Sequence, residues 1–254
     1  MKYFRLIGIL SLVVFSFFLT DFVTELAIKS NPLYKTIKDN SSNYSCKSVN
    51  ATIDNNTIIP GISGKEINEL ESFLNMKDFG EFNKNYLIYE YISPDISIEN
   101  NKDKIIISGN KSIRSVSLLI KNNVSIIKYL NENSIKYSKL VKLNDTLDKE
   151  NINIEGIEKD FKDLNTLLKK KELNKKICLL DYSNIKVCKD LKYYVVKHNY
   201  EISNSNIYNV ISNIENGNII LINDNLSLEN FKLFLNKAKS KDMEFKYLSE
   251  IIKE

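Results

Sequence analysis

The chain has 254 residues, of which 36 are lysine or arginine, 32 are acidic and one is histidine. This near balance of charge gives no field for nucleic acid, so a nucleic-acid-binding protein is excluded. The length allows a sizeable core in one domain with an extension, or in a small and a medium domain.

The N-terminal segment predicts a membrane helix. Lys2 and Arg5 precede an uncharged run over residues 6–19, and the apolar stretch over residues 4–23 approaches the roughly 20 residues that a bilayer span needs. The basic residues keep the N-terminus in the cytoplasm, which predicts a single-pass cell-membrane protein with an extracellular C-terminal domain. A cleaved signal peptide, and hence a secreted protein, is the alternative; no clear small-x-small cleavage site supports it.

Residues 24–58 are polar and rich in Asn and Ser, which indicates a flexible stalk after the membrane segment of residues 1–23. Residues 59–110 indicate a small region of helix and strand that packs on, or leads into, the next domain. A helix is predicted over residues 65–79 in this region. Ser63 and Glu66 have the spacing of a capping box before it.

Gly80 is well placed to end that helix. Residues 87–98 alternate apolar and polar positions, but Pro94 limits them to an edge or extended segment. Short β-rich runs then alternate with helix-like stretches. The runs cover residues 105–109, 115–121, 134–142, 175–181, 192–197 and 217–223, and the helices 124–133, 157–170, 184–191, 207–214 and 226–239. This alternation predicts an α/β fold with a parallel sheet or barrel.

The three cysteines are Cys46, Cys178 and Cys188. An odd number in an oxidising location allows at most one bridge. Cys178 and Cys188 each lie in an apolar pattern, which favours buried small hydrophobes.

The C-terminal pattern is specific. Residues 213–224 (NIENGNIILIND), a helix, and residues 241–252 (KDMEFKYLSEII) resemble the end of the polysaccharide deacetylase, or NodB-homology, domain of carbohydrate esterase family 4. Residues 115–124 lie where that family carries its "vaLTFDDGP" motif, and residues 177–182 where it carries "fRpPyG". The resemblance implies a distorted or incomplete (β/α) barrel over residues 111–254.

The family's chemistry does not carry over with the fold. The resemblance implies one aspartate as catalytic base, and a second aspartate with two histidines that hold a divalent metal. Lys121 and Asn122 occupy the two aspartate positions, and Asn223 occupies the position of the histidine in the last motif, which leaves Asp224. One histidine, His198, cannot supply a pair, so we expect no metal and no cofactor.

Several polar residues remain as candidates for a degenerate site. Lys121, Asn122, Asn223 and Asp224 follow predicted strands, where barrel sites lie, although solvated loops would explain them too. Tyr182 and Asp181 are candidates for substrate binding, since a tyrosine ring can stack on a sugar; packing is the alternative for Tyr182.

These observations predict a polysaccharide deacetylase-like protein of the cell envelope that has become a pseudoenzyme. It would bind peptidoglycan, another envelope polysaccharide or a protein partner, and the membrane through residues 4–23. One alternative is a hydrolase of N-acetyl carbon–nitrogen bonds with a rearranged site that uses Asp181, Asp224 or Glu201. The other is a structural spacer without ligand.

Overall fold

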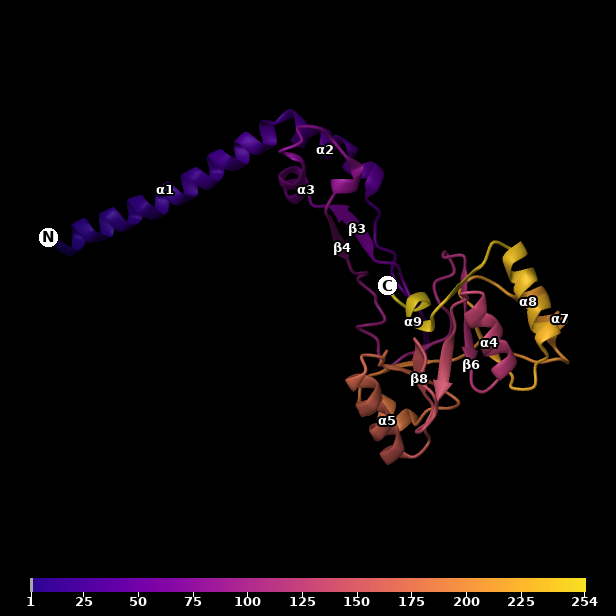
Figure 1. The fold of residues 1–254 in the computed structure, drawn as a ribbon. Coiled ribbons are helices and arrows are strands. Elements are labelled where there is room, and N and C mark those ends of the chain that lie inside the picture. The colour runs from indigo at the N-terminus through magenta and orange to yellow at the C-terminus, as the bar shows by residue number, and fades with distance from the viewer. Residues whose placement is uncertain (1) are drawn as a thin grey trace. The chain divides into compact units, whose positions relative to one another are not determined.

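The computed structural model describes the backbone of residues 2–254 and the side chains of residues 15–20 and 22–254. The chain divides into two compact units (Figure 1). The smaller unit comprises the residues up to 48 together with residues 63–92. The larger unit comprises residues 49–62 and 93–254.

The smaller unit is a helical layer on an antiparallel hairpin. Its elements are α1 (Lys2–Ser30), α2 (Pro32–Tyr44), β3 (Gly64–Ile67), α3 (Glu69–Met76), the 3-10 helix η1 (Lys84–Tyr86) and β4 (Tyr89–Ile92). Ile37 of α2 and Met76 of α3 are fully buried in its core, beside Phe73. This core holds α2 and α3 against each other.

The predicted transmembrane helix is not supported. It covers residues 1–23, most of whose side chains lie outside the described ones. Where side chains are described, no helix is long and apolar enough to cross a membrane.

The expected stalk over residues 24–58 is instead folded. It contains α2 and, in the larger unit, strands β1 (Thr52–Asp54) and β2 (Thr57–Ile59). Asn31 caps α2 by accepting a hydrogen bond from the Leu33 N–H, and Pro32 takes the first helical position. Ile37 supplies the buried face of a helix whose other residues are mostly polar. The polar composition of residues 24–58 therefore gave no indication of α2.

The predicted helix over residues 65–79 begins later than expected. Gly64–Ile67 pairs with β4 as strand β3, and Asn68, which accepts a hydrogen bond from the Glu71 N–H, caps α3. Pairing across the hairpin thus overrides the Ser63–Glu66 spacing. The prediction of an edge strand near Pro94 agrees with β4, whose ladder partner is β3.

The larger unit contains parallel strands that alternate with helices, as predicted. One sheet has the order β1-β2-β5-β10-β9, and a second has the order β11-β12-β6-β7-β8, with β13 also pairing with β6. The pairs described here are parallel except for β1 with β2. The remaining strands are β5 (Ile105–Ile106), β6 (Ser115–Ile120), β7 (Ser138–Val141), β8 (Asn151–Asn153), β9 (Ile177–Leu179), β10 (Tyr194–Val196), β11 (Tyr200–Ile202), β12 (Ile219–Ile222) and β13 (Glu244–Lys246).

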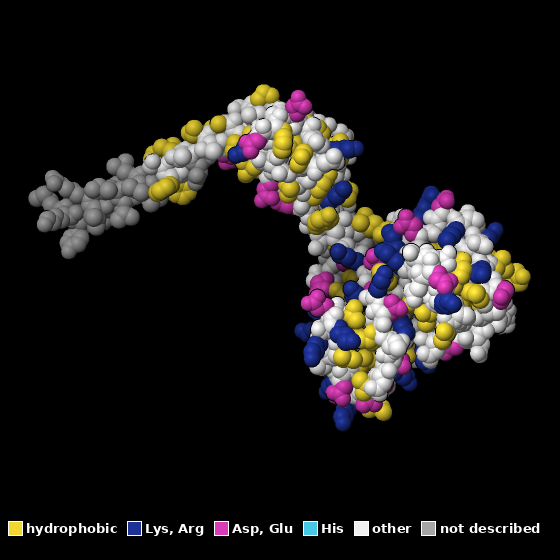
Figure 2. Space-filling view, in the orientation of Figure 1, with side chains coloured by type: hydrophobic (Ala, Val, Ile, Leu, Met, Phe, Trp, Pro, Cys, Tyr) yellow, Lys and Arg dark blue, Asp and Glu magenta, His cyan; other side chains and the backbone are white. Residues whose placement is uncertain are grey.

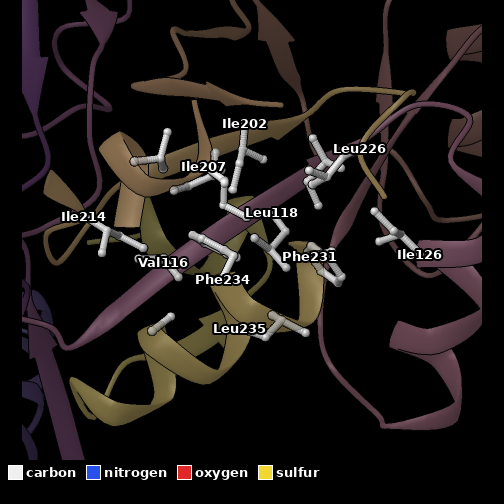
Figure 3. Packing of buried hydrophobic residues seen from close by; sticks show 14 of the residues in the cluster. Val116, Leu118, Ile126, Ile202, Ile207, Ile214, Leu226, Phe231, Phe234 and Leu235 are labelled. Atoms are coloured by element: carbon white, nitrogen blue, oxygen red, sulfur yellow. The ribbon is translucent and has the colours of Figure 1, made fainter. Parts of the chain in front are cut away.

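Helices lie between these strands in the chain, and a last helix, α9, follows β13. They are α4 (Val124–Glu132), α5 (Glu158–Lys170), α6 (Ile185–Asp190), α7 (Ile207–Asn213), α8 (Leu228–Ser240) and α9 (Leu248–Ile251). Figure 3 shows Phe231 and Phe234 of α8 packed with Leu118 of β6. Alternate residues of β6 face the other way, where Leu119 joins a core shared by both sheets. Because β6 is buried on both faces, its sequence is a continuous apolar run.

Cys178 and Cys188 form a disulfide that links β9 to α6, while Cys46 is a free, exposed thiol. Both bridged residues are fully buried, as predicted, but they are not separate thiols. The bridge closes a short loop that contains Asp181 and Tyr182. It therefore restrains the segment that carries two of the candidate site residues.

Candidate functional site

A pocket of about 260 Å³ opens at the ends of several strands in the larger unit. Lys121 follows β6, Asn223 and Asp224 follow β12, and Tyr182 lies shortly after β9. Because the strands run parallel, their carboxyl ends meet on one edge, where ligands bind in α/β proteins. The full lining is Lys121, Leu140, Tyr182, Glu201, Leu221, Ile222, Asn223, Asp224 and Asn225.

The segments after β6 and β12 are joined by hydrogen bonds. The Asn122 backbone N–H donates to Asp224 Oδ1 at 3.1 Å. Asn123, which is buried, donates from its side-chain amide to the backbone carbonyls of Asp224 and Leu226 at 3.0 and 2.9 Å. Asn123 Oδ1 also caps α4 by accepting from the Ile126 N–H. These bonds fix the rim of the pocket.

Glu201 of β11 enters the pocket beside Asn223. Asn223 Nδ2 donates to Glu201 Oε1 at 2.8 Å, and Asn223 Oδ1 accepts from the Asn225 N–H at 3.0 Å. The Asn223 N–H donates to the Ile202 carbonyl, which continues the β11–β12 ladder past its end. Asn223 thus orients a carboxylate.

Tyr182 and His198 lie side by side near the pocket, with ring centroids 6.2 Å apart. Burial raises the pKa of Tyr182, and the charges of Glu201, Asp181 and Asp224 raise it further. Burial lowers the pKa of His198, although Asp181 and Glu201 oppose that shift. Its Nδ1 is buried without a hydrogen-bond partner among the described residues. Burial therefore disfavours the protonated imidazole.

The structure brings together most of the residues singled out from the sequence. Lys121, Tyr182, Asn223 and Asp224 line the pocket with Glu201. The two other candidates, Asn122 and Asp181, are not part of this lining. The backbone N–H of Asn122 donates to Asp224, and the charge of Asp181 raises the pKa of Tyr182.

Sequence reasoning missed several contributors. Leu140 and Leu221 line the floor of the pocket, but an apolar residue in a buried strand carries no signal for a site. Asn123 was detectable, because it stands immediately before a predicted helix in the position of an N-cap. Asn225 continues the polar stretch that ends the last motif.

The fold is that of carbohydrate esterase family 4. Wild-type BA3943 of Bacillus anthracis, a CE4 family pseudoenzyme, has a TM-score of 0.58 with this chain at 17% identity, over 87% of this chain and 95% of its own. A BA3943 mutant with restored enzymatic activity also has a TM-score of 0.58 at 17% identity, over 87% of this chain and 98% of its own. Both neighbours are described as members of carbohydrate esterase family 4, so the resemblance predicted from the sequence is confirmed at the level of the fold.

The sequence matches no family model. It is similar to the uncharacterized protein YlxY of Bacillus subtilis, at 34% identity over 101 residues that cover 39% of this chain. That match covers 31% of YlxY, so this chain corresponds to less than a third of its relative's length.

The residues in the pocket do not fit the divalent metal that the fold family implies. Lys121 brings an ammonium group into the lining, and both carboxylates there already accept hydrogen bonds, Asp224 from Asn122 and Glu201 from Asn223. Over the described side chains, no three His, Cys, Asp or Glu residues are grouped to hold a metal ion.

Proposed function

We propose that this chain is a non-catalytic, polysaccharide deacetylase-like protein that binds an envelope glycan in the pocket at the strand ends. The observation that carries the proposal is the convergence of Lys121, Tyr182, Glu201, Asn223 and Asp224 on one pocket. The fold places a pocket at the strand ends. The residues at the family's motif positions differ, so this pocket has a different chemistry.

The composition of the pocket suits a sugar. Tyr182 is half-buried and offers a ring face for stacking, while the neighbouring amides and carboxylates offer hydrogen-bond partners for hydroxyl groups. The volume of about 260 Å³ is below the ~300–1,000 Å³ of most small-molecule pockets. It is therefore suited to one sugar ring of a longer glycan.

The absence of catalysis follows from the same residues. Hydrolysis of an N-acetyl group needs a base that takes a proton from water, and metal-bound water is a common nucleophile for it. Lys121, an ammonium group that donates hydrogen bonds, stands where the resemblance implies the catalytic aspartate. The similarity in fold to BA3943, which is named a CE4 family pseudoenzyme, supports this proposal.

We also propose that α1 anchors the protein in the cell membrane with the larger unit outside. The exposed apolar side chains of α1 support this location, since water would otherwise surround them (Figure 2). They are Phe15, Phe17, Phe18, Leu19, Phe22, Val23 and Leu26. Alkaline carbonate extraction tests the proposed anchor. An anchored chain stays in the membrane pellet, whereas a shortened chain in the culture medium would indicate a cleaved signal peptide.

The glycan proposal is tested with the full chain kept in mild detergent. Isothermal titration calorimetry with peptidoglycan fragments and amino-sugar tetramers should give saturable binding. Tyr182→Ala should weaken it by about two- to tenfold, because stacking contributes roughly 0.5–1.5 kcal/mol. Tyr208→Ala is the matched control, since Tyr208 is exposed on α7 and does not line the pocket.

Two outcomes would contradict the proposal. Acetate released from acetylated fragments at a rate that falls in Asp224→Asn or Glu201→Gln would establish the rearranged hydrolase. Failure of every fragment to bind at millimolar concentration would favour the structural spacer.

A further inference from the structure

Two carboxylates share the pocket with Tyr182, and a third is its neighbour in the chain. Glu201 and Asp224 line the pocket, and Asp181 precedes Tyr182 in the chain. Glu201 accepts its hydrogen bond from the neutral amide of Asn223, and Asp224 accepts from the Asn122 backbone N–H. Across the described residues, none of the three carboxylates belongs to an ion pair. Their negative charge is therefore available to a ligand.

The pKa of Tyr182 is a second indication of this negative charge. After burial, the causes that raise the pKa of Tyr182 are the charges of Glu201, Asp181 and Asp224. The pocket lining also contains Lys121, which follows β6. The lining therefore combines one lysine with two carboxylates, Glu201 and Asp224.

We infer that the pocket takes an amino sugar whose nitrogen is a free ammonium, as in a de-N-acetylated glycan. This inference rests on the proposed glycan-binding function and specifies its ligand. An ammonium group donates up to three hydrogen bonds, which Glu201 and Asp224 can accept, and it is attracted to the face of the Tyr182 ring. An acetamido group in the same place carries no charge and has one N–H donor, so it would replace fewer of the hydrogen bonds that water gives the carboxylates.

The ligand so defined is the product, and not the substrate, of N-deacetylation. A protein with this pocket would recognise glycan that another enzyme has already deacetylated. The class of reaction that supplies its ligand is therefore amide hydrolysis on an N-acetylated polysaccharide.

The test compares two tetramers of equal length, glucosamine tetramer and N-acetylglucosamine tetramer, on the full chain in detergent at low ionic strength. We expect the free-amine tetramer to bind about tenfold more tightly, because two exposed charge pairs contribute roughly 0.2–1 kcal/mol each. The preference should shrink in about 0.5 M salt, since exposed charges are screened. This measurement on the unaltered chain does not depend on any variant folding.

Variants then locate the charge. Glu201→Gln and Asp224→Asn should each weaken binding of the free-amine tetramer by about two- to fivefold, and by a larger factor than they weaken binding of the N-acetylated tetramer. Glu215→Gln is the matched control, because Glu215 lies before β12, at the opposite end of that strand from the pocket.

The outcomes separate the two proposals. Tighter binding of the N-acetylated tetramer would overturn the inference and leave the proposed glycan binding intact. Equal binding of the two tetramers that changes neither with salt nor in Glu201→Gln would have the same consequence. Binding of neither tetramer would overturn the proposed function itself.

Discussion

The backbone N–H of Asn122 donates a hydrogen bond to the side chain of Asp224 across two adjacent strand ends, at 3.1 Å. Residues 102 positions apart in the chain thereby share one rim. Their neighbour Asn123 strengthens the link through its side chain, which bonds both to the loop after β12 and to the first turn of α4. The rim of the pocket is thus built into the fold.

Asn123→Ala should destabilise the larger unit by about 1–3 kcal/mol, because it removes an N-cap and leaves buried carbonyls without a donor. Urea unfolding measures the loss. Asn133→Ala is the control at the other end of α4, where the side chain is exposed and donates to the Tyr129 carbonyl at 2.8 Å. Similar losses in the two variants would contradict a special role for Asn123.

Removal of the disulfide should lower stability by about 2–3 kcal/mol, which is the loop-closure entropy of a bridge with a sequence separation of 10. The double variant Cys178→Ala with Cys188→Ala tests this by urea unfolding. Cys46→Ala removes the exposed free thiol and should change stability by less than about 0.5 kcal/mol. Without a reductant, thiol alkylation should add one adduct to the double variant, at Cys46, and none to Cys46→Ala, whose remaining cysteines are bridged.

Glu150→Ala should destabilise the larger unit by about 2–4 kcal/mol, because this buried carboxylate accepts from the Ser138 hydroxyl at 2.6 Å and from the Ser249 N–H at 3.1 Å. Ser138 Oγ in turn accepts from the Leu248 N–H, so the contact holds α9 in place. Glu150→Gln keeps an acceptor and should cost less than the alanine variant. An equal loss in both would mean that the negative charge, and not the hydrogen bonds, is essential.

Stability should fall as the pH drops from about 7.5 to 5.5, and His198 should account for part of that fall. Burial holds the pKa of His198 in the folded chain below its usual value near 6.5. The unfolded chain therefore binds the proton more readily, so stability present above pH 6.5 is lost as the pH falls through the folded pKa. His198→Gln should show a smaller difference in urea midpoint between these pH values; an unchanged difference would contradict the argument.

Apolar periodicity predicted three of the helices in the larger unit. The helices expected over residues 124–133, 157–170 and 226–239 agree with α4, α5 and α8 to within two residues. Such patterns are strong because each helix buries one face against a sheet. Strand β8 was missed, since its sequence Asn151–Asn153 is polar. It is buried because its asparagines bond locally, as when Asn153 Nδ2 donates to the Phe161 carbonyl.

The hairpin β1–β2 was also missed, although the turn at residues 54–57 carries asparagines and Asn55 adopts a left-handed φ of 50°. The rule that sites lie at strand ends selected Lys121, Asn223 and Asp224, and these residues line one pocket with Tyr182. It could not place Leu140, nor show that Asn122 contributes its backbone. The position of Leu140 and the backbone contact of Asn122 depend on the register of neighbouring strands. The residues of one strand do not by themselves determine that register.

The pairing of Tyr182 with His198 makes the pocket observable by spectroscopy. The chain has one histidine and no tryptophan, so its proton NMR spectrum contains the signals of a single imidazole. Those signals arise beside the pocket. A Tyr182→Trp substitution would likewise introduce the sole indole fluorophore at the same place. Ligand entry can thus be followed through native or single-site probes, with no label elsewhere on the molecule.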